Sequence, residues 1–199
     1  MDLKSTAEKI IRLKNADLEL RERLVRNGEL GAGYHEEMQN LHIRNSEILG
    51  EIIDRTGYPT VEKMGEEASE AAWMVIQHAI ARPDFMRRCL KLLEDSAPET
   101  HIEKINIAYL YDRIAVFEDR PQLYGTQFDW DENGQLSPNA YDDLNKVNER
   151  RKSLGLNSLE EQTVLIRNRA LKENQNPPAD LKQRKAEMEA WKKSVGWTT

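Results

Sequence analysis

Hydrophobic residues recur along most of this chain at helical spacing, and two segments are apolar on nearly every side. Residues 71–81 read Ala-Ala-Trp-Met-Val-Ile-Gln-His-Ala-Ile-Ala, so that Gln77 and His78 interrupt an otherwise apolar run. Residues 105–117 form a second segment of this kind. A helix that is apolar all round is typical of a protein interior. The pattern therefore predicts two buried helices.

Each buried segment carries two adjacent polar residues, Gln77-His78 in the first and Asp112-Arg113 in the second. A polar group in an apolar interior costs roughly 1–3 kcal/mol unless it finds a partner. Adjacent residues of a helix point about 100° apart, so neither member of a pair can satisfy the other. We therefore expect the two pairs to share one interior polar site.

The other periodic segments predict amphipathic helices with short connections. The first one opens at a Ser5–Glu8 capping-box pattern and places Asp17 on its apolar stripe. Glu132-Asn133-Gly134 predicts the turn of a hairpin between residues 124–130 and 135–136. The predicted helices span residues 5–27, 35–56, 65–81, 83–95, 100–117, 137–154, 158–172 and 180–195.

These elements predict a mainly α-helical protein with two parts. Residues 1–172 are expected to form a compact helical domain around the two buried helices, with the small β-hairpin attached. Residues 173–199 are expected to be an extension, because Pro177-Pro178 cannot continue a helix and separates the last helix from the rest.

Composition narrows the class of partner. The 199 residues carry a net charge of −6 with no basic stripe, so a nucleic-acid partner is not expected. No apolar signal region stands at the N-terminus and no run of about 18 apolar residues occurs, which predicts a soluble cytoplasmic protein without a membrane partner. Cys89 is the only cysteine, which excludes a disulfide framework. The sequence leaves the oligomeric state open.

Several motifs together resemble a bacterial family catalogued as a domain of unknown function. The most specific pieces read AAWMVIQHA from Ala71, YLYDRIAV from Tyr109 and QLYGTQ from Gln122. Gly57-Tyr58-Pro59, Arg150-Arg151 with Gly155-Leu156, and more weakly Asp17 with Arg21 extend the resemblance over about residues 17–165. The family supplies no activity, so the resemblance implies no function.

The polar residues predict an enzyme for a small polar, anionic substrate. His78 would move a proton, since histidine titrates near neutral pH, and Asp112 would orient it. Arg113 would hold the negative charge of the substrate. The side chains expected to orient this ligand are Gln77, Gln122, Tyr124 and Gln127. Hydrolysis or cyclisation by acid–base chemistry fits this set.

No cofactor and no metal are expected from the sequence. The run from Asp129 to Gly134 imitates the start of a calcium loop, but Ala140 stands where the bidentate glutamate belongs. The alternative to an enzyme is a non-catalytic interaction or ligand-binding protein whose buried polar cluster is structural. In that case the last helix, with Trp191 and Trp197, would be the useful surface.

Overall fold

The computed structural model describes residues 2–29, 33–95 and 101–199 of the chain. It is mainly α-helical with one small antiparallel sheet, which confirms the predicted fold class. The residues divide into two compact units, Met1–Asp95 and Ser96–Thr199, and each is described by itself. No helix among the described residues is both long enough and apolar enough to cross a membrane.

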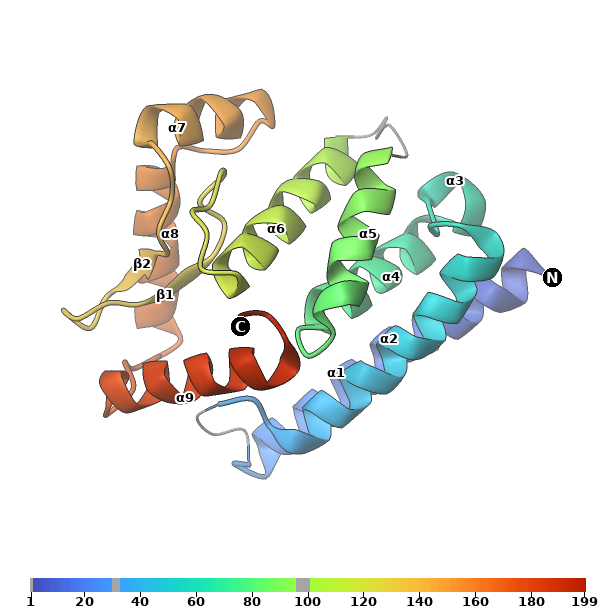
Figure 1. Cartoon of the computed structure of the whole chain (residues 1–199), viewed down its shortest axis with the longest axis horizontal. Helices are drawn as coiled ribbons and strands as arrows, with labels where there is room; N and C mark the ends of the chain where they lie inside the picture. Colours follow the sequence, from blue (N-terminus) through green and yellow to red (C-terminus); the bar gives the residue numbers. More distant parts are fainter. Residues whose placement is uncertain (1, 30–32, 96–100) are drawn as a thin grey trace. The chain divides into compact units, whose positions relative to one another are not determined.

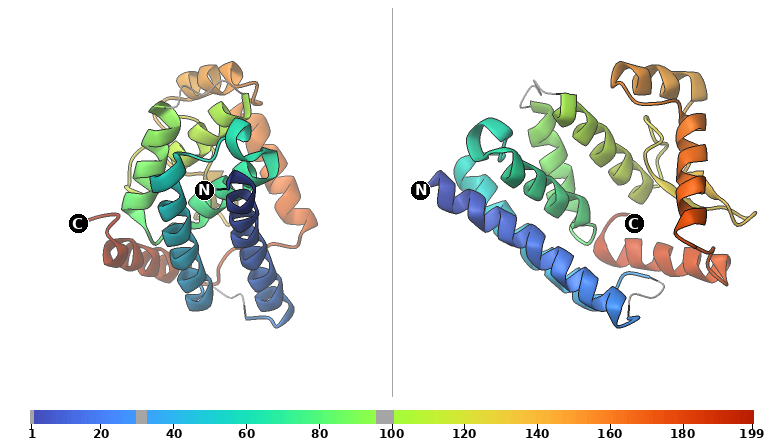
Figure 2. Two further views of the ribbon diagram at one scale, coloured as in Figure 1. Left: turned by 90° about the vertical axis from the view of Figure 1, so that its right-hand side faces the viewer. Right: turned by 180° about the vertical axis from the view of Figure 1, so that it is seen from behind.

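The first unit is built from helices α1 to α5 (Figure 1). The long helices α1 and α2 run side by side in opposite directions, and α4 packs against both of them (Figure 2). The bounds are Leu3–Arg26 for α1, Glu36–Thr56 for α2, Val61–Met64 for α3, Glu66–His78 for α4 and Pro83–Asp95 for α5.

Helix α4 is the first of the two predicted buried helices, and it lies in the core of this unit. Its buried apolar residues are Ala68, Ala71, Ala72, Val75 and Ile76. The three alanines are small and let α1 approach closely. The helix ends at His78 rather than at Ala81, so His78 lies on its last turn, at the edge of the core.

The second unit contains α6, the hairpin and helices α7 to α9. Strands β1 and β2 pair antiparallel with Asp129 opposite Ser137, which confirms the predicted hairpin. The bounds are His101–Phe117 for α6, Phe128–Trp130 for β1, Leu136–Pro138 for β2, Leu144–Ser153 for α7, Leu159–Lys172 for α8 and Leu181–Val195 for α9. Helix α6 is the second predicted buried helix, with Leu110 and Asp112 fully buried.

Helix α9, which follows the predicted boundary after residue 172, is part of the second unit. The ring of Trp197 stacks on Phe117 with 5.0 Å between centroids. Lys192 is only 3% exposed and pairs with Asp119. The linker that contains Pro177-Pro178 separates α8 from α9. The contacts of Trp197 and Lys192 nevertheless pack the C-terminal segment against other residues of the second unit.

Candidate functional site

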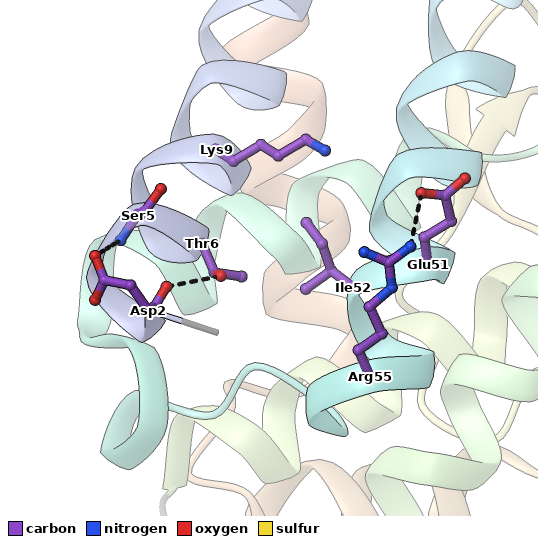
Figure 3. Close-up of a pocket in the computed structure, with 7 residues that line it drawn as sticks. All are labelled: Asp2, Ser5, Thr6, Lys9, Glu51, Ile52 and Arg55. Atoms are coloured by element: carbon purple, nitrogen blue, oxygen red, sulfur yellow. Dashed lines mark hydrogen bonds and ion pairs between the residues drawn. The ribbon is translucent and has the colours of Figure 1, made fainter.

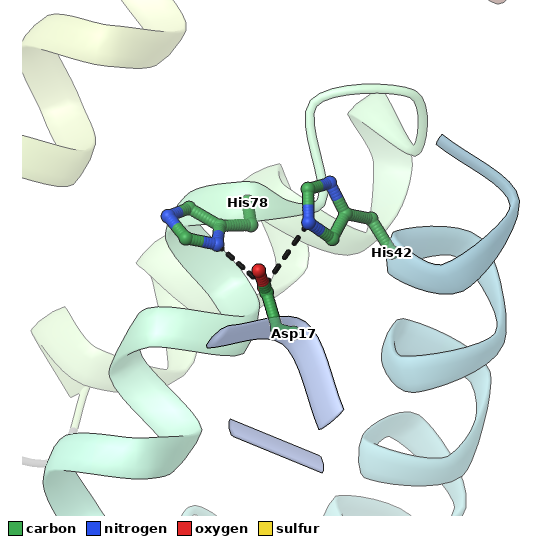
Figure 4. Close-up of side chains that lie close together, drawn as sticks. All are labelled: Asp17, His42 and His78. Atoms are coloured by element: carbon green, nitrogen blue, oxygen red, sulfur yellow. Dashed lines mark hydrogen bonds and ion pairs between the residues drawn. The ribbon is translucent and has the colours of Figure 1, made fainter. Parts of the chain in front are cut away.

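The first unit holds a cluster of one carboxylate and two imidazoles, shown in Figure 4. Nδ1 of His78 lies 2.6 Å from Oδ2 of Asp17. Nε2 of His42 lies 3.0 Å from the same oxygen. The side chains of Asp17 and His42 are 1% and 7% exposed, whereas that of His78 is 33% exposed. The cluster is therefore buried, with one imidazole reaching solvent.

Three helices each contribute one member of this cluster. Asp17 comes from α1, His42 from α2 and His78 from the last turn of α4. Asp17 occupies the apolar stripe of α1, between the fully buried Ile10 and Leu24. The packing of α1 against α4 therefore buries a carboxylate that the two histidines must satisfy.

Tyr34 extends the cluster on the far side of His42. Its hydroxyl lies 2.5 Å from Nδ1 of His42 and 3.3 Å from the carbonyl oxygen of His78. The hydroxyl has a single hydrogen, so its donation to one acceptor or the other sets which nitrogen of a neutral His42 carries the proton. Burial, reinforced by the charge of Asp17, raises the pKa of Tyr34, so the hydroxyl stays protonated.

The electrostatics of the cluster keep Asp17 ionised. Burial by itself raises the pKa of this carboxyl, but the neighbouring His42 and His78 rings lower it by more. The net pKa of Asp17 therefore lies well below its usual value. Within the part of the chain that the structure describes, the buried Oδ1 of Asp17 has no hydrogen-bond partner.

The predicted pairing of His78 with Asp112 needs correction. The carboxylate beside His78 is that of Asp17. Asp112 belongs to the other unit and accepts hydrogen bonds there from the backbone N–H groups of Leu123 at 2.8 Å and Thr126 at 2.9 Å. The sequence showed that each polar pair needed partners but could not show which ones.

Asp112 organises the loop that contains the QLYGTQ motif. Its two oxygens accept from three backbone N–H groups of residues 123–126, the third being that of Tyr124 at 3.2 Å. Burial raises the pKa of this carboxyl, and the backbone donors act in the opposite direction. The expected catalytic role of Asp112 is thus replaced by a structural one, in which a buried side chain satisfies a turn of backbone.

Gln122 and Arg151 complete the support of this loop. The fully buried Gln122 donates to the carbonyl oxygens of Gln127 and Asn139 and accepts from the backbone N–H of Gln127 at 2.7 Å. The buried Arg151 donates to the carbonyl oxygen of Tyr124 at 2.9 Å and also binds Asn157. Gln122, predicted to bind ligand, is therefore used internally.

The remaining predicted ligand-binding residues fall in both units. In the second unit, Nε of Arg113 donates to Oε1 of Gln127 at 3.2 Å, and both residues are half-buried. Tyr124 is half-buried in the same loop. In the first unit, Gln77 is buried beside His78 on α4. Arg113 and Gln127 are thus in contact, and Tyr124 lies on the same loop as Gln127, whereas Gln77 and His78 lie on α4 of the first unit.

A family model described as a family of unknown function, DUF6624, matches residues 5–174 of the chain. The chain belongs to DUF6624. No curated protein and no solved structure matches the chain. The resemblance noted from the motifs is thereby confirmed, and the match takes in both units of the DUF6624 chain.

Among the described residues of the DUF6624 chain, two cavities in the first unit are lined by residues other than the cluster. One, of about 220 Å³, is drawn in Figure 3, where Asp2 bonds to Ser5 and Thr6. Its lining residues are Asp2, Ser5, Thr6, Lys9, Glu51, Ile52 and Arg55. The other, of about 480 Å³, is lined by Glu47 and Arg82, which already form an ion pair at 2.9 Å. In each cavity, polar groups of the lining bond to one another: Asp2 with Ser5 and Thr6 in the first, and Glu47 with Arg82 in the second.

Sequence reasoning missed His42 and Tyr34 in this DUF6624 chain. His42 is 6% exposed and lies on the inward face of α2, with the buried Met38 and Asn45 on adjacent turns. A histidine on an apolar stripe, together with Asp17 on another, was the available signal. Sequence spacing could not predict that these residues meet, because Asp17, His42 and His78 lie on three different helices.

Proposed function

We propose that the first unit carries the acid–base centre of an enzyme that acts on a small polar substrate. The observation that supports it is the pairing of His78 Nδ1 with Asp17 Oδ2 at 2.6 Å on a ring that remains 33% exposed. A carboxylate that fixes Nδ1–H leaves Nε2 as the basic nitrogen. This is the arrangement that general-base catalysis requires.

In this proposal each residue of the cluster has one task. His78 accepts a proton from the substrate, or from a water molecule, at Nε2 and returns it later. Asp17 holds Nδ1–H and stabilises the imidazolium that forms, because its own low pKa keeps it ionised throughout. His42, oriented by Tyr34, helps to fix the carboxylate. Gln77 precedes His78 on the same helix and remains a predicted substrate-binding residue.

The second unit carries a separate candidate anion-binding group, centred on Arg113. Its guanidinium is oriented through Nε by Gln127, and the planar, always-charged guanidinium suits a carboxylate or phosphate. We propose Arg113, Tyr124 and Gln127 as the anion-binding group of that unit. Arg113→Lys should weaken anion binding while Arg120→Lys, an exposed control on the same unit, should not.

The test of the catalytic proposal compares His78→Gln with His35→Asn in protein freed of metal by a chelator. His35 accepts from the backbone N–H of Glu37 at the start of α2, and asparagine can keep that cap. Turnover of small anionic metabolites with hydrolysable bonds would be screened with the wild type first. His78→Gln should lower the rate by about 10²–10⁴-fold with little change in melting temperature, whereas His35→Asn should do neither.

The alternative, a non-catalytic protein with a structural cluster, makes the reverse prediction. His78→Gln would then unfold the first unit at a much lower temperature, and the wild type would turn over none of the screened compounds. That pair of results would replace the enzyme proposal with the structural one.

A further inference from the structure

We infer that Asp17, His42 and His78 form a binding site for one divalent transition-metal ion of the Zn²⁺ type. This inference goes beyond the proposed proton-transfer function and stands on separate observations. Three observations support it: the set of donor atoms, the buried atoms that lack hydrogen bonds, and the contact of Tyr34 with His42. None of these was visible as a metal motif in the sequence.

The donor set is the first observation. Two imidazole nitrogens and a carboxylate oxygen, all within 4.8 Å of one another, converge from three helices. Zinc binds such ligands at about 2.0–2.2 Å in a tetrahedron, which places ligand atoms about 3.3–3.6 Å apart. The two nitrogens lie 2.6 and 3.0 Å from Oδ2 of Asp17, so the separations are shorter than that spacing by about 1 Å or less. Imidazole donors favour Zn²⁺, Co²⁺ or Cu²⁺ over Mg²⁺ and Ca²⁺, which prefer oxygen ligands.

The unsatisfied atoms are the second observation. Among the described residues, Oδ1 of Asp17 and Nε2 of His42 are buried and complete no hydrogen bond, although Nε2 lies 3.0 Å from Oδ2 of Asp17. A buried carboxylate oxygen without a donor is costly, and natural proteins rarely leave one. A cation between the carboxylate and the two rings would satisfy both atoms at once.

Tyr34 supplies the third observation. A metal-binding histidine usually donates its other ring N–H to a second residue, which fixes the ring and its tautomer. The Tyr34 oxygen lies 2.5 Å from Nδ1 of His42 and can accept that hydrogen, while its own hydrogen goes to the carbonyl oxygen of His78 at 3.3 Å. This arrangement leaves Nε2 of His42 without a hydrogen, so that its lone pair is directed at the cluster.

The site has three protein ligands and one partly exposed wall. Structural zinc sites are closed by four protein ligands, whereas sites with three leave a position for water or substrate. The exposure of His78 gives the ion a route to solvent. Metal binding at Nδ1 requires that the proton of His78 reside on Nε2. The metal-bound state and the metal-free base of the proposed function therefore exclude each other.

The test is a metal titration that needs no substrate. Full-length, tag-free protein is stripped with a chelator and titrated with Zn²⁺ in a calorimeter, and with Co²⁺ while its visible spectrum is recorded. We expect saturable binding of one ion per chain and the intense visible bands of tetrahedral Co²⁺. His78→Gln should weaken binding by more than about 100-fold, beyond the usual cost of losing an outer partner. His35→Asn should bind like the wild type.

A second variant guards against misfolding. Tyr34→Phe keeps all three ligands and should weaken Zn²⁺ binding by about 10–100-fold through loss of the outer hydrogen bond. The inference is overturned if the wild type shows no saturable binding. It is equally overturned if His78→Gln, folded by circular dichroism, binds as the wild type does. Failure of turnover in the preceding screen has no bearing on this titration, so the two proposals fail separately.

Discussion

Asp17 and His78 are joined by a 2.6 Å contact between Oδ2 and Nδ1, although 61 positions separate them in the sequence. The carboxylate is 1% exposed and the imidazole 33% exposed. This contact connects the middle of α1 to the end of α4 and makes His78 the part of the cluster that reaches solvent. The cluster of Asp17, His42 and His78 should therefore stabilise the first unit, while the loop held by Asp112 and the last helix should stabilise the second.

Replacing Asp17 with asparagine should destabilise the first unit. The variant keeps the size of the side chain but removes the carboxylate charge that both histidine rings face, and a hydrogen bond to a charged group typically contributes about 1.5–3 kcal/mol. Denaturant unfolding followed by circular dichroism measures the loss. Asp54→Asn is the matched control, since its ion pair with Arg88 is exposed and should contribute at most about 1 kcal/mol. Equal effects of the two variants would contradict a stabilising role for the buried carboxylate.

Acid should weaken the wild type through the same residue. The pKa of Asp17 is lowered in the folded state, so the unfolded chain binds more protons at this carboxyl as the pH falls. Its contribution is therefore present above the unfolded pKa of about 3.9 and is lost as the pH drops below it. The stability difference between the wild type and Asp17→Asn should shrink between about pH 5 and pH 3. A difference that stays constant over that range would refute the assignment.

Gly125→Ala should disrupt the loop that Asp112 organises. Gly125 has a φ of +61°, and a Cβ there would lie 2.7 Å from Cδ1 of Leu159. The overlap and the left-handed backbone should together cost about 2–4 kcal/mol. Gly28→Ala is the control, because Gly28 also has a positive φ of +70° but open space around it. Thermal melts should show the larger loss for Gly125→Ala.

Removal of residues 173–199 should destabilise the second unit. The truncated chain would lose the stacking of Trp197 on Phe117 and the ion pair of Arg184 with Asp129 at 2.7 Å. Loss of a buried tryptophan alone typically costs about 3–5 kcal/mol. Amide hydrogen exchange on α6 would report the effect, with Trp197→Ala as a milder version. Unchanged protection of α6 would instead support the prediction from the sequence that residues 173–199 are an extension.

The sequence by itself determined most elements of this protein, although the helix predicted over residues 137–154 begins only at Leu144, after strand β2, and α3 was not predicted. Helical periodicity predicted the buried segments that became α4 and α6, and Asn133-Gly134 predicted the hairpin turn between β1 and β2. Motif resemblance indicated a family of unknown function, and the match to DUF6624 over residues 5–174 confirmed membership of such a family. These features depend on spacing between near neighbours, or on motifs that can be compared directly, so they can be found without coordinates.

Only the tertiary structure decided which polar residues meet. His78 could be seen to need a partner, but the partner depended on the helix against which α4 packs, and α4 packs against α1, which carries Asp17. His42 entered the cluster because α2 also packs against α4. Side-chain contacts between helices depend on which helices pack together and in which register. Local periodicity in the sequence predicts neither.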